Sequence, residues 1–138
     1  MKIVNFALLA GVAGMLAACG GSSIVEPTDL NDQRVFFAFN SAEISEEANN
    51  NLLGQALYLK NHEDTKIQIA GNCDERGSTE YNLALGARRA NAAKRVLVND
   101  GIDPSRISTI SYGKERPLVR GTGEDVWKYT RNATTPVK

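Results

Sequence analysis

The stretch of residues 79–100 constrains the fold more than any other part of the sequence, because its apolar face is built largely from small side chains. The members of this stripe are spaced for one face of a helix, and they are Leu83, Gly86, Ala90, Ala93 and Leu97. Gly101 follows, and glycine is common directly after the end of a helix. A helix with so little bulk on its inner face can approach a sheet closely, so we expect it to pack against strands.

The segments around this helix alternate between strand and helix patterns. β-Branched and aromatic residues predict strands at residues 34–39, 66–70 and 106–112. An apolar stripe after Ser41 or Ser45, either of which can cap a helix, predicts a first helix ending near residue 61. A short helix is expected at residues 124–131. This order predicts an α+β fold, with two main helices on one face of a mixed sheet of three to four strands. The last strand is expected to be degenerate, because Pro136 lacks an N–H and suits only a sheet edge.

The N-terminal segment has the pattern of an export signal. Residues 1–18 carry one cation, Lys2, before an apolar run that is too short to remain as a membrane span. The run ends in Leu-Ala-Ala-Cys at residues 16–19, which resembles the lipobox of bacterial lipoproteins. That resemblance implies acylation of Cys19, and Gly20 in place of an aspartate implies transfer to the outer membrane. The alternative is an ordinary signal peptide that leaves Cys19 as a free thiol.

Three segments are therefore expected: a signal peptide at residues 1–18, a lipidated N-terminus and flexible linker at 19–33, and one folded domain at 34–138. The linker can span roughly 45 Å when extended, which keeps the domain near a membrane surface. If Cys19 is lipidated, Cys73 has no disulfide partner in the chain. Basic and acidic side chains are equal at 16 each, which argues against a broad basic surface for nucleic acid.

A candidate ligand site follows the second expected strand. Asp74 lies in the loop, while Asn82 and Arg89 are seven residues apart and share one helix face. An aspartate can accept from an ammonium group, and a guanidinium can hold a carboxylate, so such a groove suits a small zwitterion. Asn82 would orient the ligand or brace the loop, and Tyr81 or Leu85 would form an apolar wall or pack in the core. The simpler alternative is a surface ion pair between Asp74 and Arg89, worth about 0–1 kcal/mol.

Catalytic and metal-binding patterns are weak. Cys73 could act as a thiol nucleophile, but the only histidine, His62, is expected at the end of the first helix. No zinc-type spacing and no phosphate-binding loop are present in the sequence. We therefore expect no catalytic residue, no metal and no cofactor, and a protein that is not an enzyme.

Three sequence blocks carry a family resemblance: "FFAFNS", "GNCDERGSTEYNLALGARRANAAKRVL" and "GIDPSRISTISYGKERP". Across about residues 35–131 the chain resembles the OmpA-like C-terminal domain family. The resemblance implies a domain that binds the stem peptide of peptidoglycan noncovalently through meso-diaminopimelate. The family's binding aspartate and arginine fall on Asp74 and Arg89, and Asn82 and Leu85 match positions that line or shape the same site.

The resemblance also implies partners and a location. The partners are peptidoglycan and the periplasmic Tol proteins TolB and TolA, and the location is the periplasmic face of the outer membrane. The chain departs from the family at the end of the first strand, where Asn40, next to Ser41 in the candidate site, replaces an aspartate. Near the C-terminus only Arg131 remains of an Asn-Arg-Arg motif. An alternative is therefore a lipid-anchored periplasmic interaction module that has lost wall binding.

Overall fold

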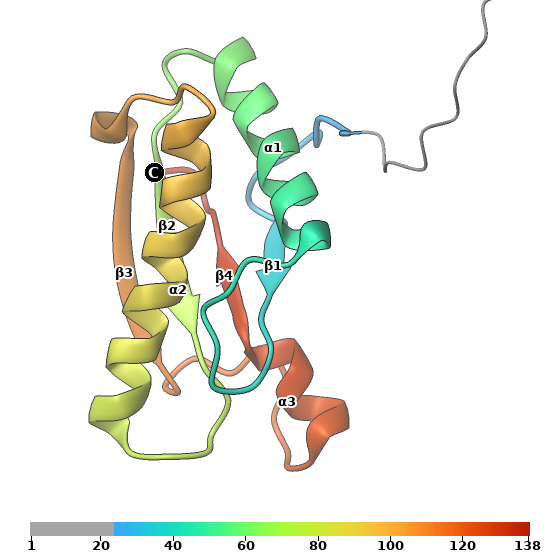
Figure 1. The fold of residues 1–138 in the computed structure, drawn as a ribbon, viewed down its shortest axis with the longest axis vertical. Helices are drawn as coiled ribbons and strands as arrows, with labels where there is room; N and C mark the ends of the chain where they lie inside the picture. The colour runs from blue at the N-terminus through green and yellow to red at the C-terminus, as the bar shows by residue number, and fades with distance from the viewer. Residues whose placement is uncertain (1–23) are drawn as a thin grey trace, which may run out of the picture.

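The computed structural model describes residues 24–138, which form a four-stranded sheet and three α-helices (Figure 1). The elements in chain order are β1 (Arg34–Phe36), α1 (Glu46–Asn61), β2 (Ile67–Asn72), α2 (Thr79–Asn99), a 3-10 turn (Pro104–Arg106), β3 (Ile107–Gly113), α3 (Glu124–Thr130) and β4 (Asn132–Thr134). The expected signal peptide, Cys19 and the first part of the linker lie outside the described residues. Within the described range, no helix has the length and apolar character needed to cross a membrane.

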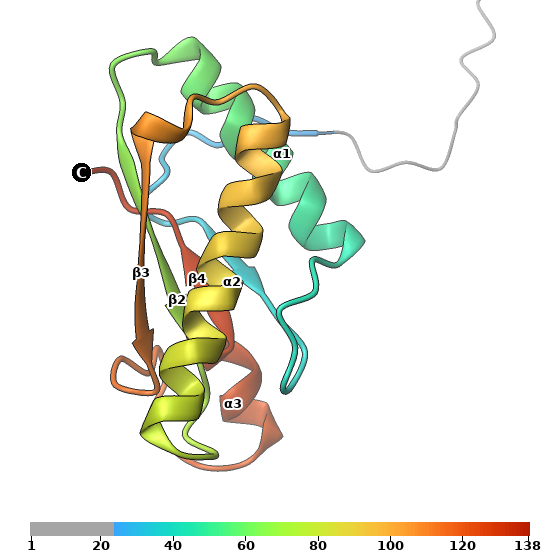
Figure 2. The same ribbon diagram turned by 60° about the vertical axis from the view of Figure 1, so that its left-hand side comes forward.

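The sheet is mixed, with the strand order β1-β4-β2-β3. Strands β2 and β3 are parallel, whereas β4 runs antiparallel to both β1 and β2. The two long helices, α1 and α2, lie on the same face of this sheet (Figure 2). The predicted α+β class and the packing of both main helices on one face are thereby confirmed.

The expectation of a degenerate last strand at a sheet edge is only partly right. β4 is three residues long, but it is inserted between β1 and β2. Ala133 is fully buried there, and Thr134 is paired with Arg34 on one side and Ala70 on the other. Pro136 follows the strand and accepts a hydrogen bond from the backbone N–H of Gln68 at 3.1 Å. At that position only a carbonyl is required, so the missing N–H of proline does no harm.

The helix ends follow from their capping residues. The Ser45 hydroxyl accepts from the backbone N–H of Ala48, which decides between the two expected caps of α1. Ser78 caps α2 in the same way through the N–H of Tyr81. Gly101 directly follows the C-cap of α2 and has φ +103°, a conformation that favours glycine.

Helix α2 packs unusually close to the sheet, as its small residues predict. A Cβ atom added at Gly71 of β2 would overlap the backbone carbonyl of Gly86, and one added at Gly86 would overlap the Ser111 side chain. The expectation that Leu83 belongs to the core stripe is wrong, because its side chain is exposed. Asn82 occupies the buried position instead, and the other buried residues of α2 are Leu85, Gly86, Arg89, Ala90, Ala93 and Leu97.

From the sequence alone the domain is expected to start at Arg34, but the packed unit begins before that residue. Leu30 is fully buried in the core cluster. The Asn31 side chain accepts a hydrogen bond from the backbone N–H of Val137 at 3.0 Å. The Val25 carbonyl lies against Gly54 of α1, so closely that a Cβ there would overlap it. Part of the expected linker is therefore packed onto the domain.

Candidate functional site

The candidate site lies at one end of the sheet, where four segments meet. These are the loop after β2, the first turns of α2, the segment between β1 and α1, and α3 (Figure 1). A small cavity there is lined by Phe39, Asn40, Cys73, Asp74, Arg76, Tyr81, Asn82, Leu85 and Arg89. Its volume is about 10 Å³. Five of the six ligand-site residues expected from the sequence line this cavity, and Ser41 does not.

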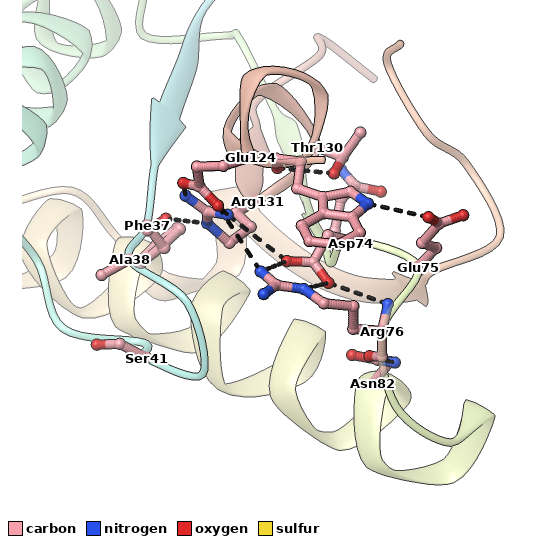
Figure 3. Close-up of polar contacts among 12 residues, drawn as sticks. Phe37, Ala38, Ser41, Asp74, Glu75, Arg76, Asn82, Glu124, Thr130 and Arg131 are labelled. Atoms are coloured by element: carbon pink, nitrogen blue, oxygen red, sulfur yellow. Dashed lines mark hydrogen bonds and ion pairs between the residues drawn. The ribbon is translucent and has the colours of Figure 1, made fainter. Parts of the chain in front are cut away.

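Asp74 is a nearly buried carboxylate whose two oxygens are both engaged. Its side chain is 4% exposed. Arg76 donates from Nε to Oδ1 at 3.2 Å and from its NH2 nitrogen to Oδ2 at 2.8 Å, and the Arg76 backbone N–H also donates to Oδ1 (Figure 3). The guanidinium of Arg131 lies 3.6 Å from Oδ2. Burial alone would raise the pKa of Asp74, but the hydrogen bonds from Arg76 and the charges of Arg76 and Arg131 together lower it. The group is therefore an anion at neutral pH.

Arg89 also lines the cavity, but its guanidinium holds the backbone. It is 1% exposed and donates to three carbonyl oxygens, at distances of 2.8 Å to Asn72, 3.0 Å to Ala38 and 2.9 Å to Ser41. Burial lowers the pKa of Arg89, although arginine remains charged at any physiological pH. Asp74 and Arg89 thus share one cavity, as the sequence predicts. Among the described residues, however, the ion-pair partners of Asp74 are Arg76 and Arg131 rather than Arg89.

The remaining expected residues support the cavity in different ways. Asn82 is buried and donates to the Arg76 and Ser78 carbonyls, so it braces the loop after β2. Leu85 is buried and contributes an apolar wall. Asn40 lies in the left-handed region with φ +57°. Ser41 contributes its backbone carbonyl to Arg89, while its hydroxyl accepts from the Glu43 N–H.

Sequence reasoning missed a cluster of charged and aromatic residues around Arg76. The Arg76 guanidinium lies 3.8 Å from the ring centroid of Phe39 and 4.0 Å from that of Trp127. Glu124 accepts two hydrogen bonds from Arg131, and one of its oxygens lies 3.9 Å from Arg76 (Figure 3). Arg76 stands two residues after Asp74, and that short spacing is the one signal in the sequence for this contact.

Cys73 is a buried thiol. Its Sγ lies 3.3 Å from the backbone carbonyl of Asn82, to which it donates. Burial raises the pKa of the Cys73 thiol, so the reactive thiolate is disfavoured at neutral pH. His62 stacks on Tyr58 after the end of α1, and its Nδ1 is 2.8 Å from the Tyr58 carbonyl. Across residues 24–138 no group of three or more His, Cys, Asp or Glu side chains is arranged to hold a metal ion.

Comparisons with known proteins agree on one family. The model of the OmpA family matches residues 36–131. A peptidoglycan-associated lipoprotein of Mesorhizobium japonicum is 42% identical over 134 residues, which cover 97% of this chain and 79% of that protein. A peptidoglycan-associated lipoprotein of Pasteurella multocida is 38% identical, with 96% of each chain covered.

Solved structures show the same fold. The crystal structure of the peptidoglycan-associated lipoprotein from Burkholderia pseudomallei superposes with a TM-score of 0.74 at 39% identity, covering 76% of this chain and 89% of that one. The C-terminal domain of Helicobacter pylori MotB superposes with a TM-score of 0.72 at 18% identity, over 77% and 84% of the two chains. At that low identity the second match speaks for the fold alone.

Proposed function

The chain belongs to the OmpA family, and we propose that its cavity binds the stem peptide of peptidoglycan noncovalently through meso-diaminopimelate. Three of the similar proteins reported above are named as peptidoglycan-associated lipoproteins, which supports association with the cell wall. Membership in this family also confirms the prediction that the chain is not an enzyme.

One observation carries the proposal: an ionised, nearly buried carboxylate shares a cavity with a buried guanidinium. The free end of diaminopimelate carries an ammonium and a carboxylate. Asp74 would accept hydrogen bonds from the ammonium. Arg89 has five N–H donors and gives three of them to backbone carbonyls. The remaining two would attract the ligand carboxylate, while the buried Leu85 would contact its aliphatic part.

The wider role in the proposal depends on the N-terminal segment. Acylation of Cys19 would anchor the chain in the outer membrane, and several acyl chains make such an anchor effectively permanent. The domain would then tether that membrane to peptidoglycan from its periplasmic face. In this role it would work with the Tol proteins TolB and TolA during cell division.

A second candidate function is a lipid-anchored interaction module that no longer binds the wall. The observation in its favour is the small volume of the cavity, about 10 Å³. Within it the Asp74 carboxylate already accepts a hydrogen bond from Arg76. On this alternative the charged cluster would be purely structural, and a protein partner would bind elsewhere on the domain.

Sedimentation with purified, insoluble peptidoglycan separates the two functions. We expect the wild-type chain to sediment with the wall, and Asp74→Asn to lose at least about tenfold in affinity, since a charged hydrogen-bond acceptor is removed. Asp64→Asn is the matched control, because it removes the same charge from an exposed position after α1. Equal sedimentation of all three proteins, each shown to be folded, would refute wall binding through Asp74.

A further inference from the structure

The cavity at Asp74 is too small for the ligand that we propose. A volume of about 10 Å³ is close to the space of a single water molecule. Both oxygens of Asp74 already accept hydrogen bonds from Arg76. An amino-acid head can therefore enter only if a side chain in the lining moves away.

Exposure and contact with Asp74 together indicate which lining side chain moves. Phe39, Asn40 and Tyr81 are exposed, but the side chain that donates to both Asp74 oxygens is Arg76. Asn82 and Arg89 are buried and tied to backbone carbonyls, and Cys73 and Leu85 are buried beside them. The Arg76 side chain is 31% exposed. It lies against the ring of Phe39, which is itself exposed, and against the half-buried ring of Trp127. Arg76 is thus the charged lining residue with a path to solvent.

We propose that Arg76 is an internal occupant of the ligand's ammonium position, and that binding displaces it from Asp74. This inference rests on the proposed function and concerns the same site. The Arg76 guanidinium offers Asp74 what a ligand ammonium would offer, namely a positive charge and N–H donors. The rings of Phe39 and Trp127, whose faces attract cations, would flank the entering ammonium as they now flank Arg76.

A second acceptor for Arg76 lies nearby. An oxygen of Glu124 is 3.9 Å from the Arg76 NH2 nitrogen, and the Glu124 side chain is 62% exposed. A small swing across Trp127 would bring Arg76 to Glu124 as it leaves Asp74. Arg131, 3.6 Å from Asp74, stays in place and keeps a positive charge beside the carboxylate. Binding is then an exchange of ion pairs, in which no charge is left unpaired.

The exchange has a consequence for specificity. A ligand must supply a cation of its own, because otherwise Asp74 loses the hydrogen bonds from Arg76 and gains none. It also has a consequence for affinity, because part of the ligand's interaction energy is spent on moving Arg76. A side chain at position 76 that cannot pair with Asp74 should therefore leave the site more open to the ligand.

The test is a calorimetric titration of the full chain with meso-diaminopimelate. We expect Arg76→Gln to bind about tenfold more tightly than wild type, which is the scale of one charged hydrogen-bonded contact. Arg76→Lys keeps the positive charge but cannot donate two parallel hydrogen bonds to Asp74, so its affinity for the ligand should lie between those of wild type and Arg76→Gln. Arg88→Gln removes a charge from an exposed position of α2 and should bind as wild type does. Thermal unfolding of each variant checks that it is folded.

A second readout follows Arg76 itself. In the free protein the Arg76 Nε–H donates to Asp74, so its NMR signal should be protected from exchange with water. Saturation with the ligand should remove most of that protection, because the new acceptor, Glu124, is 62% exposed. Binding of Arg76→Gln that is equal to or weaker than wild type, or an Nε–H that stays protected at saturation, would overturn the displacement while leaving wall binding intact. If the folded wild type and Arg76→Gln both fail to bind, the proposed function itself fails, and the displacement fails with it.

Discussion

Arg89 lines the proposed ligand site, and its side chain also holds the fold together. Its guanidinium donates to the Asn72 carbonyl in a buried hydrogen bond and to the Ala38 and Ser41 carbonyls in partly buried ones, and the Ala38 carbonyl also accepts from the Ser41 N–H. We expect Arg89→Ala to lower the free energy of unfolding by at least about 2 kcal/mol, because a buried acceptor without a donor costs on the order of 1–3 kcal/mol and each further hydrogen bond that is lost costs about 0.5–1.5 kcal/mol. Denaturant unfolding measures this change.

The control for Arg89 is its neighbour. Arg88 is exposed, so Arg88→Ala should change the free energy of unfolding by less than about 0.5 kcal/mol. If the two variants lose the same stability, the hydrogen bonds of Arg89 do not hold the loop. Because of this structural role, loss of wall binding in Arg89→Ala would not by itself identify a ligand contact, and Asp74 is the better position for that test.

Asp74 should make the fold sensitive to acid. Burial raises its pKa, yet Arg76 and Arg131 lower it further, so the pKa in the folded state lies below the ordinary value. Its contribution to stability is thus complete above the unfolded pKa of about 3.9 and is lost as pH falls through the lower folded value. Asp74→Asn should therefore lose less stability than wild type when pH falls below about 4. Unfolding curves between pH 2 and pH 7 measure how the free energy of unfolding of each protein depends on pH. The same pH dependence in both would contradict a lowered pKa for Asp74.

The sequence located Asp74 and Arg89 because both follow from local spacing: a loop after one strand, and one face of the next helix. It did not locate Trp127 or Glu124, which are about fifty residues away from Asp74 in the chain. Those two side chains reach the site only because α3 immediately precedes β4 and β4 lies beside β2. No local pattern encodes that placement.

At the level of elements, the contact between α2 and the sheet depends on glycine. Replacing glycine by alanine inside a helix ordinarily stabilises it by about 1 kcal/mol. We expect Gly86→Ala instead to lower the free energy of unfolding by about 1–3 kcal/mol, because the added Cβ would overlap the Ser111 side chain and come too close to the Gly71 carbonyl. Thermal or denaturant unfolding shows whether Gly86→Ala lowers or raises the stability.

Asn91→Ala is the matched control for Gly86→Ala. Asn91 is exposed on the same helix, so the change should stabilise slightly through helix propensity alone. A stabilising Gly86→Ala would mean that α2 can move away from the sheet at no cost.

Strand β4 shows where element prediction from sequence stops. Three residues are too few to display an alternating pattern, and Pro136 argues for an edge. In the structure the strand is central, because the proline lies just beyond it and supplies only a carbonyl to Gln68. The longer elements, α1, α2, β2 and β3, were predictable to within about two residues, since their periodicity is repeated over several turns or pleats.

At the scale of the whole molecule, the folded unit includes part of the expected linker. Leu30 is fully buried with the core residues of β1 and α1. We expect Leu30→Ala to lower the free energy of unfolding by about 2–5 kcal/mol, as for other large-to-small changes in a core. Val25→Ala, at an exposed position five residues earlier, should change it by less than about 0.5 kcal/mol. Similar small effects of both changes, measured by denaturant unfolding, would show that the segment ahead of β1 is not part of the core.

The most direct test of the account compares two ligands on one protein. Meso-diaminopimelate and pimelate have the same seven-carbon chain with two carboxylates, but only the first carries ammonium groups for Asp74. We expect wild type to bind diaminopimelate at least about tenfold more tightly than pimelate by calorimetry, and Asp74→Asn to lose this preference. Equal affinity of the folded wild-type chain for both ligands would contradict the claim that Asp74 recognises the zwitterionic end of the stem peptide.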